Sequence, residues 1–379
     1  MMDVTRKAGM FVELRDLKFA WGRFLLMGSV IALVTVLTVL LTGLSYGLVD
    51  SGISGLRAMP LTDLAFQPKT SATFSQSTLD ATTISSLNRQ PGIHAEPIGL
   101  TFFNAKLAGD ASLSIALVGI EPGGFMAKGM VGDRLGRAPM GVIISQGVAT
   151  HHVRVGDQIT LDRSRVQLRV VGFSPKATYG HVDIVYAPID LWRQATYGQV
   201  TGGVLPRSAQ GLASAAALQV RPGVNVNAVG SRLGVEIVTK QQAYQGSPGY
   251  VAETATMGLI IDFLYVIAAL IVGAFFTVWT IQRRSDIGLL KALGASTTSV
   301  VFGAIGQVAL VMLATTAAGV LVGTAIGSLI SGGAVPFSLQ SGAVFAAAVI
   351  LVIAGLVGSL VGVRRIAAID PIIALGSAS

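Results

Sequence analysis

The residue types that most often carry catalytic or metal chemistry are scarce in this sequence. There is no cysteine, which excludes disulfides, thiolate metal sites and cysteine nucleophiles. The four histidines lie in the central part of the chain and are interpreted as surface or loop residues: His94, His151, His152 and His181. His151 and His152 are adjacent, so on a strand they would face opposite sides. No catalytic arrangement stands out, and we expect a protein that is not an enzyme.

Motifs of nucleotide and acyl-transfer chemistry are also missing or incomplete. No Gly-x-x-x-x-Gly-Lys-Ser/Thr phosphate-binding loop occurs in the sequence. The segment GVIISQG at residues 141–147 only loosely resembles the Gly-x-Ser-x-Gly of hydrolases and lacks its spacing. Although the net charge is +8, no run of lysine and arginine with interleaved aromatics supports nucleic-acid binding. We therefore expect no nucleic-acid partner.

The elements that must position any functional residue are long apolar runs. Only 12% of the residues are charged, and the mean hydropathy is +0.68, whereas average soluble domains carry about 25% charged residues. Residues 24–48 are 25 uncharged, mostly apolar residues, and about 20 suffice to cross a bilayer. A second uninterrupted run covers residues 263–282 in a span assigned to 257–282. Asp262 then lies either within the hydrocarbon or before the helix begins, and we favour the second reading.

A third apolar region must fold back on itself. Residues 292–363 contain no Asp, Glu, Lys or Arg over 72 positions. One helix of that length would extend about 108 Å, far beyond a hydrocarbon core of about 30 Å. The turn-rich break at 331–342 contains Pro336 and several glycines. We therefore predict two spans here, with small-residue motifs GVLVG and GTAIG that permit close helix packing.

The basic residues set the orientation of these four spans. Five precede the first span, three follow the second and two follow the fourth, namely Arg6, Lys7, Arg15, Lys18, Arg23, Arg283, Arg284, Lys291, Arg364 and Arg365. Cytoplasmic loops are enriched in Lys and Arg. Both termini are therefore predicted to be cytoplasmic, in a cell (plasma) membrane, with residues 49–256 outside.

The central 200 residues are predicted to form an α+β domain. The segment QITLDRSRVQLRVVGF at 158–173 alternates apolar and polar residues around a turn at Asp162–Ser164. GVIISQGV, VDIVYAP and AALQVRP are interpreted as further short strands, and helices are expected at 77–88 and 226–233. The fold class is thus membrane α-helical, with four transmembrane helices and one inserted extracytoplasmic α+β domain.

Three segments resemble a known family of membrane proteins. RRSDIGLLKALGASTTSV at 283–300 is similar to the loop after the second span in FtsX-like, MacB-like ABC permeases, with Asp286 in place of the common Glu. RRIAAIDPIIAL at 364–375 resembles the C-terminal tail of that family. ELRDLKFAWGRFLLM at 13–27 resembles its DevC/HrtB branch, whose HrtB members are hemin-transport permeases. The resemblance implies the MacB-like (type VII) ABC permease architecture.

The resemblance also implies partners and a coupling segment. ATP would be bound and hydrolysed on a separate MacB-like ATPase subunit, in an assembly of two ATPases and a permease homodimer in membrane lipid. A short amphipathic helix after the second span would dock on that ATPase. The residues assigned to this role are Arg283, Arg284, Asp286, Ile287, Gly288, Lys291, Leu293 and Gly294. The alternative interpretation of this loop is a positive-inside anchor that only fixes topology.

These considerations divide the chain into nine parts. They are a cytoplasmic N-terminal amphipathic segment (1–23), a transmembrane helix (24–48), the extracytoplasmic domain (49–256), a transmembrane helix (257–282), the coupling segment (283–299), a transmembrane helix (300–330), an extracytoplasmic turn (331–342), a transmembrane helix (343–363) and a cytoplasmic tail (364–379).

If the substrate is haem, as the resemblance implies, the protein needs apolar walls, a cation for the propionates and weak iron ligands. No cofactor would be held permanently, and no metal other than the haem iron is expected. The spans contain no histidine, so the candidates at the outer ends of the first two spans are Tyr46, Met59, Glu253, Met257 and Asp262, with Arg57 for the propionates. Glu253 and Met257 are four apart and share a helix face. The alternative roles are an interfacial cap for Glu253 and core packing for Met59 and Met257.

Two other functions remain open at this point. The same machine would serve for export of a different amphipathic substrate, such as a lipid, lipoprotein or peptide. FtsX-type proteins, in contrast, transmit a signal across the membrane to cell-wall hydrolases and move no cargo. The resemblance favours a haem exporter in which the first two spans move and the last two support them.

Overall fold

The chain forms two compact units in a computed structural model that describes residues 21–367, apart from 108–111, 136–139, 150–151, 163, 199–203 and 334. One unit, here called the outer domain, comprises Leu48–Glu253. The other, the helical unit, comprises the described residues up to Gly47 and from Thr254 onward. Most of the predicted segment 1–23, most of the tail 364–379 and His151 lie outside the described residues.

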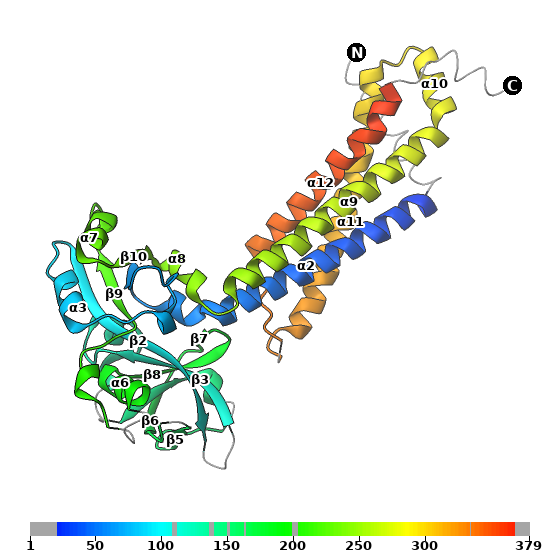
Figure 1. The fold of residues 1–379 in the computed structure, drawn as a ribbon. Coiled ribbons are helices and arrows are strands. Elements are labelled where there is room, and N and C mark those ends of the chain that lie inside the picture. Colours follow the sequence, from blue (N-terminus) through cyan, green and yellow to red (C-terminus); the bar gives the residue numbers. More distant parts are fainter. Residues whose placement is uncertain are drawn as a thin grey trace. The chain divides into compact units, whose positions relative to one another are not determined.

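Four long apolar helices carry the chain through the helical unit (Figure 1). They are α2 (Trp21–Ala58), α9 (Tyr250–Gln282), α11 (Thr297–Ile330) and α12 (Ser341–Ala367), with the short α10 (Arg284–Ala292) between the second and third. Each has a stretch that is long and apolar enough to cross a membrane. The protein is therefore a multi-pass membrane protein with a large domain inserted between its first and second spans.

Two of these helices continue well beyond the predicted spans. Helix α2 extends to Ala58, and α9 begins at Tyr250. Because α9 starts twelve residues before Asp262, that residue lies inside the helix, and the expectation that the helix begins after it is wrong. The sequence TATMGLIID contains no proline to interrupt the helix before Asp262.

Glycines bring α11 close to α2. The predicted motifs GVLVG and GTAIG place Gly319, Gly323 and Gly327 on one buried face of α11. A Cβ atom at Gly319 would lie 2.5 Å from the Cβ of Thr35 and 2.7 Å from the carbonyl oxygen of Ala32, both on α2, so only a glycine fits this contact. Small residues permit this approach between helices in a membrane, where no hydrophobic force drives them together.

The connection between α11 and α12 is tied to α2. The backbone N–H of Ser338 donates to the carbonyl of Gly43 at 3.0 Å. The ring of Phe337 packs where a side chain at Gly43 would otherwise lie. The predicted turn around Pro336 thus packs against α2.

The outer domain is built on one ten-stranded sheet. Its strands are β1 (Asp63–Phe66), β2 (Ile93–Lys106), β3 (Ser112–Ile120), β4 (Gly141–Ser145), β5 (Gln158–Leu161), β6 (Gln167–Ser174), β7 (Thr178–Tyr179), β8 (Val182–Pro188), β9 (Ala215–Val220) and β10 (Glu236–Thr239). The order along the sheet is β10-β1-β9-β2-β3-β8-β4-β6-β5, and β7 pairs with β8.

Part of this sheet closes on itself. Strand β5, at one end of the order, also pairs with β2 through Ala105↔Leu161 and Lys106↔Thr160. Strands β2, β3, β8, β4, β6 and β5 therefore form a ring. Each of the six contributes side chains to one buried cluster, including Phe103, Ile115, Val185, Val142, Leu168 and Ile159. The 14-residue β2 is long enough to serve both the ring and the open arm with β9.

The helices and turns of the outer domain cover the sheet. They are η1 (Phe74–Gln76), α3 (Ala81–Asn88), α4 (Phe125–Met130), η2 (Gly132–Arg134), α5 (Gln146–Ala149), α6 (Ile189–Tyr197), η3 (Arg207–Ala209), α7 (Val226–Leu233), α8 (Lys240–Ala243) and η4 (Tyr244–Gly246). The predicted helix at 226–233 is present, and the one at 77–88 begins four residues later because Asp80 caps it. The predicted strand GVIISQGV ends at Ser145, and its second half is helical.

Candidate functional site

One cluster of polar side chains joins three elements of the outer domain. Ser51 comes from the end of α2, His181 from the turn between β7 and β8, and Glu253 from the first turn of α9. His181 Nδ1 lies 2.8 Å from Ser51 Oγ, and His181 Nε2 lies 2.9 Å from Glu253 Oε1. The side chains of His181 and Glu253 are 33% and 27% exposed, so a solute can reach them. The cluster is thus both ordered and accessible.

Backbone hydrogen bonds hold the histidine in place. The N–H groups of Gly180 and His181 donate to the carbonyls of Gly52 and Ser51 at 2.9 and 3.2 Å. Both turn residues have positive φ angles, 56° for Gly180 and 65° for His181. A non-glycine residue in this conformation is uncommon and marks a constrained turn. The β7–β8 turn is therefore fixed to the last turns of α2, and the imidazole is directed by that attachment.

A glycine makes room for the carboxylate. Gly249 immediately precedes α9 with φ +81°, and its carbonyl accepts the backbone N–H of Glu253 at 2.9 Å. A Cβ atom at Gly249 would lie 2.6 Å from Glu253 Oε1 and 3.5 Å from His181 Nε2. Nearby, Ser247 Oγ donates to the carbonyl of Gly52 at 2.8 Å. The start of α9 is thus tied to α2 on one side and open to the carboxylate on the other.

Proton positions in the cluster depend on the charge of the histidine. The Ser51 hydroxyl also lies 2.8 Å from the carbonyl of Leu48, to which it donates. With that bond made, Ser51 Oγ accepts from His181 Nδ1, and an imidazolium then donates from Nε2 to Glu253 as well. A neutral imidazole that donates to Glu253 requires the Ser51 hydroxyl to turn toward Nδ1 instead. The cluster therefore contains either an imidazolium–carboxylate pair, or a neutral imidazole toward which the Ser51 hydroxyl turns.

The same three residue types occur in hydrolytic triads, yet the local bonding here differs. A catalytic serine presents its hydroxyl to substrate and to a base. Ser51 lies against its own helix at the carbonyl of Leu48, three residues earlier. The arrangement is suited to binding and positioning a carboxylate, not to nucleophilic attack.

Two other predicted site residues of the outer domain have different partners. Arg57 pairs with Asp50 at 2.7 Å, with both side chains about half exposed. Met59 is 1% exposed and belongs to the hydrophobic core, which argues against an iron-binding role and supports the packing alternative. Lys240 Nζ donates to the carbonyls of Arg57 and Met59, and burial lowers the pKa of this ammonium.

The remaining predicted residues lie in the helical unit. Tyr46 is 39% exposed on α2, Met257 is half-buried on α9, and Asp262 is exposed on α9. Because α9 is continuous from Tyr250, Met257 follows Glu253 by about one helical turn on the same face. The structure therefore keeps the Glu253–Met257 spacing, and it places against Glu253 a histidine that sequence reasoning had assigned to the surface. The sequence of the turn, YGHV, shows only that a glycine precedes this histidine.

The predicted coupling segment contains the helix α10. Ile287 is 4% exposed and anchors α10 in the core of the helical unit. Leu289 and Leu293 are 51% and 77% exposed, and Arg284 is also exposed. Gly288 is buried, and Gly294 ends the helix with φ +96°. The guanidinium of Arg283 lies 5.2 Å from the ring centroid of Trp279, and Lys291 is half-buried. The side chain of Asp286 lies outside the described residues. The helix thus presents apolar surface beside positive charge.

Comparison with known proteins gives a family for the C-terminal part of the chain and relatives for nearly all of it. Residues 258–371 match the family "FtsX-like permease C-terminal". Over 370 residues the chain is 23% identical to the "Putative hemin transport system permease protein HrtB" of Staphylococcus haemolyticus. This match covers 96% of this chain and 98% of the relative. Over 116 residues it is 34% identical to the "Uncharacterized ABC transporter permease Rv2563" of Mycobacterium tuberculosis, covering 30% of this chain and 32% of the relative.

Solved structures similar to this chain are extracytoplasmic domains. The periplasmic region of MacB from Actinobacillus actinomycetemcomitans is 14% identical with a TM-score of 0.35, covering 52% of this chain and 96% of that one. The extracellular domain of the ABC-type transporter YknZ from Gram-positive bacteria is 12% identical with a TM-score of 0.34, covering 47% of this chain and 98% of that one.

Proposed function

We propose that this chain, which is the permease subunit of an FtsX-like ABC transporter and not itself an enzyme, exports haem from the membrane to the outside. The observation that carries the proposal is the half-buried carboxylate of Glu253, which the first turn of α9 presents with Met257 one turn further on the same face. The full-length relatives named "Putative hemin transport system permease protein HrtB" support the same substrate.

The chemistry of this face suits a ligand that must be released. A carboxylate oxygen and a thioether are weak partners for haem iron compared with a pair of neutral imidazoles, and a pump has to let its cargo go. His181 holds Glu253 Oε1 at 2.9 Å, so we propose that the other oxygen, Oε2, meets the iron. The apolar residues of the first two spans would flank the porphyrin, and Arg57 would have to leave Asp50 to reach a propionate.

We further propose that two copies of this permease work with two copies of a separate ATPase in the plasma membrane. The basic residues Arg283, Arg284 and Lys291 support a cytoplasmic location for α10 in this proposal, because cytoplasmic loops are enriched in Lys and Arg. The exposed Leu289 and Leu293 would fit an apolar groove on the ATPase. Closure of the ATPases would then move α10 and shift α2 and α9 around the substrate.

Titration of the purified permease–ATPase complex with hemin tests the proposal. We expect a shifted Soret band and stimulated ATP hydrolysis. Glu253→Gln should weaken both responses, whereas Glu236→Gln, at an exposed glutamate on β10, should leave both unchanged. A complex with neither a spectral shift nor an ATPase response would refute haem export and would favour another amphipathic substrate. Capture of a cell-wall hydrolase by the outer domain would favour a signal transmitter instead.

A further inference from the structure

One aromatic side chain is exposed on the surface of the outer domain. Phe102 of β2 is 42% exposed. Every other Phe, Tyr or Trp side chain among the described residues of this domain is buried or half-buried. A single exposed apolar side chain is normal on a protein surface and needs no explanation by itself. The packing and the location of this ring are what distinguish it.

Three buried rings hold Phe102 from the core side. Its ring lies nearly parallel to that of Tyr179, with 22° between the ring planes and 6.0 Å between the centroids. Tyr179 packs edge-on against Phe74, and Phe74 packs edge-on against Phe66. These three side chains are at most 3% exposed. Stacked and edge-to-face pairs of aromatic rings are both favourable. The row of rings therefore fixes the orientation of Phe102 and leaves a flat apolar surface exposed to solvent.

The exposed ring lies beside the polar cluster of His181 and Glu253. A Cβ atom at Gly180 would lie 3.0 Å from Phe102 Cζ and 3.3 Å from Pro248 Cδ, so these two rings adjoin over a residue that has no side chain. Pro248 is exposed as well. His181 directly follows Gly180, and the residue after Pro248 is the glycine that leaves space for the Glu253 carboxylate. An apolar surface of two rings therefore borders the accessible imidazole and carboxylate.

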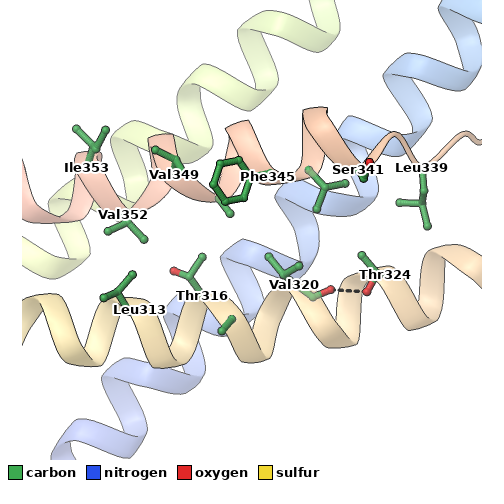
Figure 2. A pocket seen from close by; sticks show the side chains of 13 residues that line it. Leu313, Thr316, Val320, Thr324, Leu339, Ser341, Phe345, Val349, Val352 and Ile353 are labelled. Atoms are coloured by element: carbon green, nitrogen blue, oxygen red, sulfur yellow. Dashed lines mark hydrogen bonds between the residues drawn. The ribbon is translucent and has the colours of Figure 1, made fainter.

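The helical unit contains a groove that lacks this combination of groups. The groove has a volume of about 700 Å³ and lies between α11 and α12. Figure 2 shows mostly apolar walls, with Leu313 on α11 and Phe345 and Val349 on α12. None of the described residues that line it is a histidine, methionine, tyrosine or carboxylate. The groove therefore offers haem iron no ligand, and the surface at Phe102 fits a porphyrin better.

We propose that Phe102 binds the porphyrin plane of haem by stacking, with Pro248 beside it, while Glu253 contacts the iron. A carboxylate alone accepts many cations and hydrogen-bond donors, whereas an exposed aromatic ring favours a flat apolar ligand. Small-molecule sites combine apolar and aromatic walls with a few polar groups in this way. The stacking contact rests on the proposed haem export, and it adds a group that recognises the macrocycle rather than the iron.

Two ligands separate the contact to the ring from the contact to the iron. Hemin and metal-free protoporphyrin IX, which has the same macrocycle without iron, are each titrated into the purified permease–ATPase complex and followed by the Soret band. Phe102→Ala should weaken the binding of both ligands about five-fold. Phe102→Leu, which keeps apolar bulk on the strand, should also weaken both, and Phe102→Trp should retain both affinities. Val155→Ala, which truncates a 59% exposed side chain before β5, is the control and should change neither.

Glu253→Gln should give a different pattern from Phe102→Ala. It should weaken hemin binding and leave protoporphyrin binding unchanged, because that ligand has no iron. If the Phe102 variants bind both ligands like the native chain while Glu253→Gln weakens hemin, stacking is overturned and haem export stands. If protoporphyrin binding depends on Phe102 but Glu253→Gln does not affect hemin, stacking is supported and iron ligation by Glu253 is wrong. A native complex that binds neither ligand would overturn both proposals.

Discussion

The polar cluster of the outer domain and the helix α10 differ in how many of their side chains find contacts within the same chain. Both ring nitrogens of His181 have a partner from the same chain, Ser51 Oγ at 2.8 Å and Glu253 Oε1 at 2.9 Å. The outer cluster therefore ties α2, the β7–β8 turn and the start of α9 together by contacts within the chain. On α10, Ile287 and Gly288 are buried, whereas Leu289 and, just after the helix, Leu293 are exposed. The exposed leucines of α10 fit the proposed docking on an ATPase, in which a second protein would cover them.

The free energies expected from contacts on α10 and from contacts in the outer cluster differ in size. Burying a leucine side chain is favourable by about 1.5–3 kcal/mol. One hydrogen bond on a partly exposed surface contributes only about 1 kcal/mol net. Substitutions on α10 should therefore have the largest effects on assembly, and those in the outer cluster should have smaller, local effects.

The sharpest test of the comparison is the pair Leu289→Glu with Leu293→Glu. Both side chains are exposed, so the permease should still fold. Losing two buried leucines at an interface should weaken ATPase binding by about 3–6 kcal/mol, or at least 100-fold. Titration of the ATPase onto reconstituted permease measures this. Thr298→Glu, an exposed position at the start of α11, is the control. Unchanged affinity would mean that α10 is not the docking surface.

A smaller change in free energy than for the α10 leucines is expected at Gly249, which leaves space for the Glu253 carboxylate. Gly249→Ala adds both the strain of a positive φ and a contact 2.6 Å from Glu253 Oε1. Gly223→Ala shares the strain, with φ +92°, but its Cβ would meet open space. We expect Gly249→Ala to lower local stability by about 1–3 kcal/mol and Gly223→Ala to cost less. Hydrogen exchange at the start of α9 and in the β7–β8 turn, in the intact chain, measures the difference. Equal costs would show that the carboxylate is not confined by the glycine.

The sequence predicts α10 better than the polar cluster, because a helix is a local feature and the cluster joins residues far apart in the chain. The apolar spans and α10 are local features, which charge and length mark along the chain. The His181–Glu253 contact joins residues 72 positions apart, and ring closure between β2 and β5 depends on register that no local pattern encodes. For Met59 the sequence left two roles open, a haem ligand or core packing, and the residue lies in the hydrophobic core.

A double-mutant cycle tests the tie itself. His181→Ala and Glu253→Ala should each destabilise the β7–β8 turn, and their combined effect should be less than the sum by about 0.5–1.5 kcal/mol. Ser51→Ala should couple to His181→Ala but hardly to Glu253→Ala, because Ser51 contacts the imidazole at the other nitrogen. Hydrogen exchange of Gly180 and His181 amides gives the three free energies. Additive effects would mean that the two side chains do not interact in solution.

An effect of similar size is expected at Asp80, whose side chain makes a purely local polar contact in the same domain. Asp80 Oδ1 accepts from the Thr83 backbone N–H at 2.7 Å and caps α3. Hydrogen bonds from Thr83 and then Thr82 hold its pKa below the ordinary 3.8. Asp80→Ala should cost about 1 kcal/mol at neutral pH. Because the folded pKa is depressed, the charged cap's contribution is present above pH 3.8 and is lost as the pH falls through the lower folded value.

Hydrogen exchange of the α3 amides checks the size and the sign of this effect. The gap between the native chain and Asp80→Ala should narrow below pH 3.8, whereas Asp80→Asn, which keeps an acceptor without charge, should show little change with pH. If the His181–Glu253 coupling proved no larger than the cost of losing this cap, the outer cluster would be one more surface hydrogen bond. A coupling that instead changes when hemin is added would mean that substrate reaches Glu253 and that the tie responds to it.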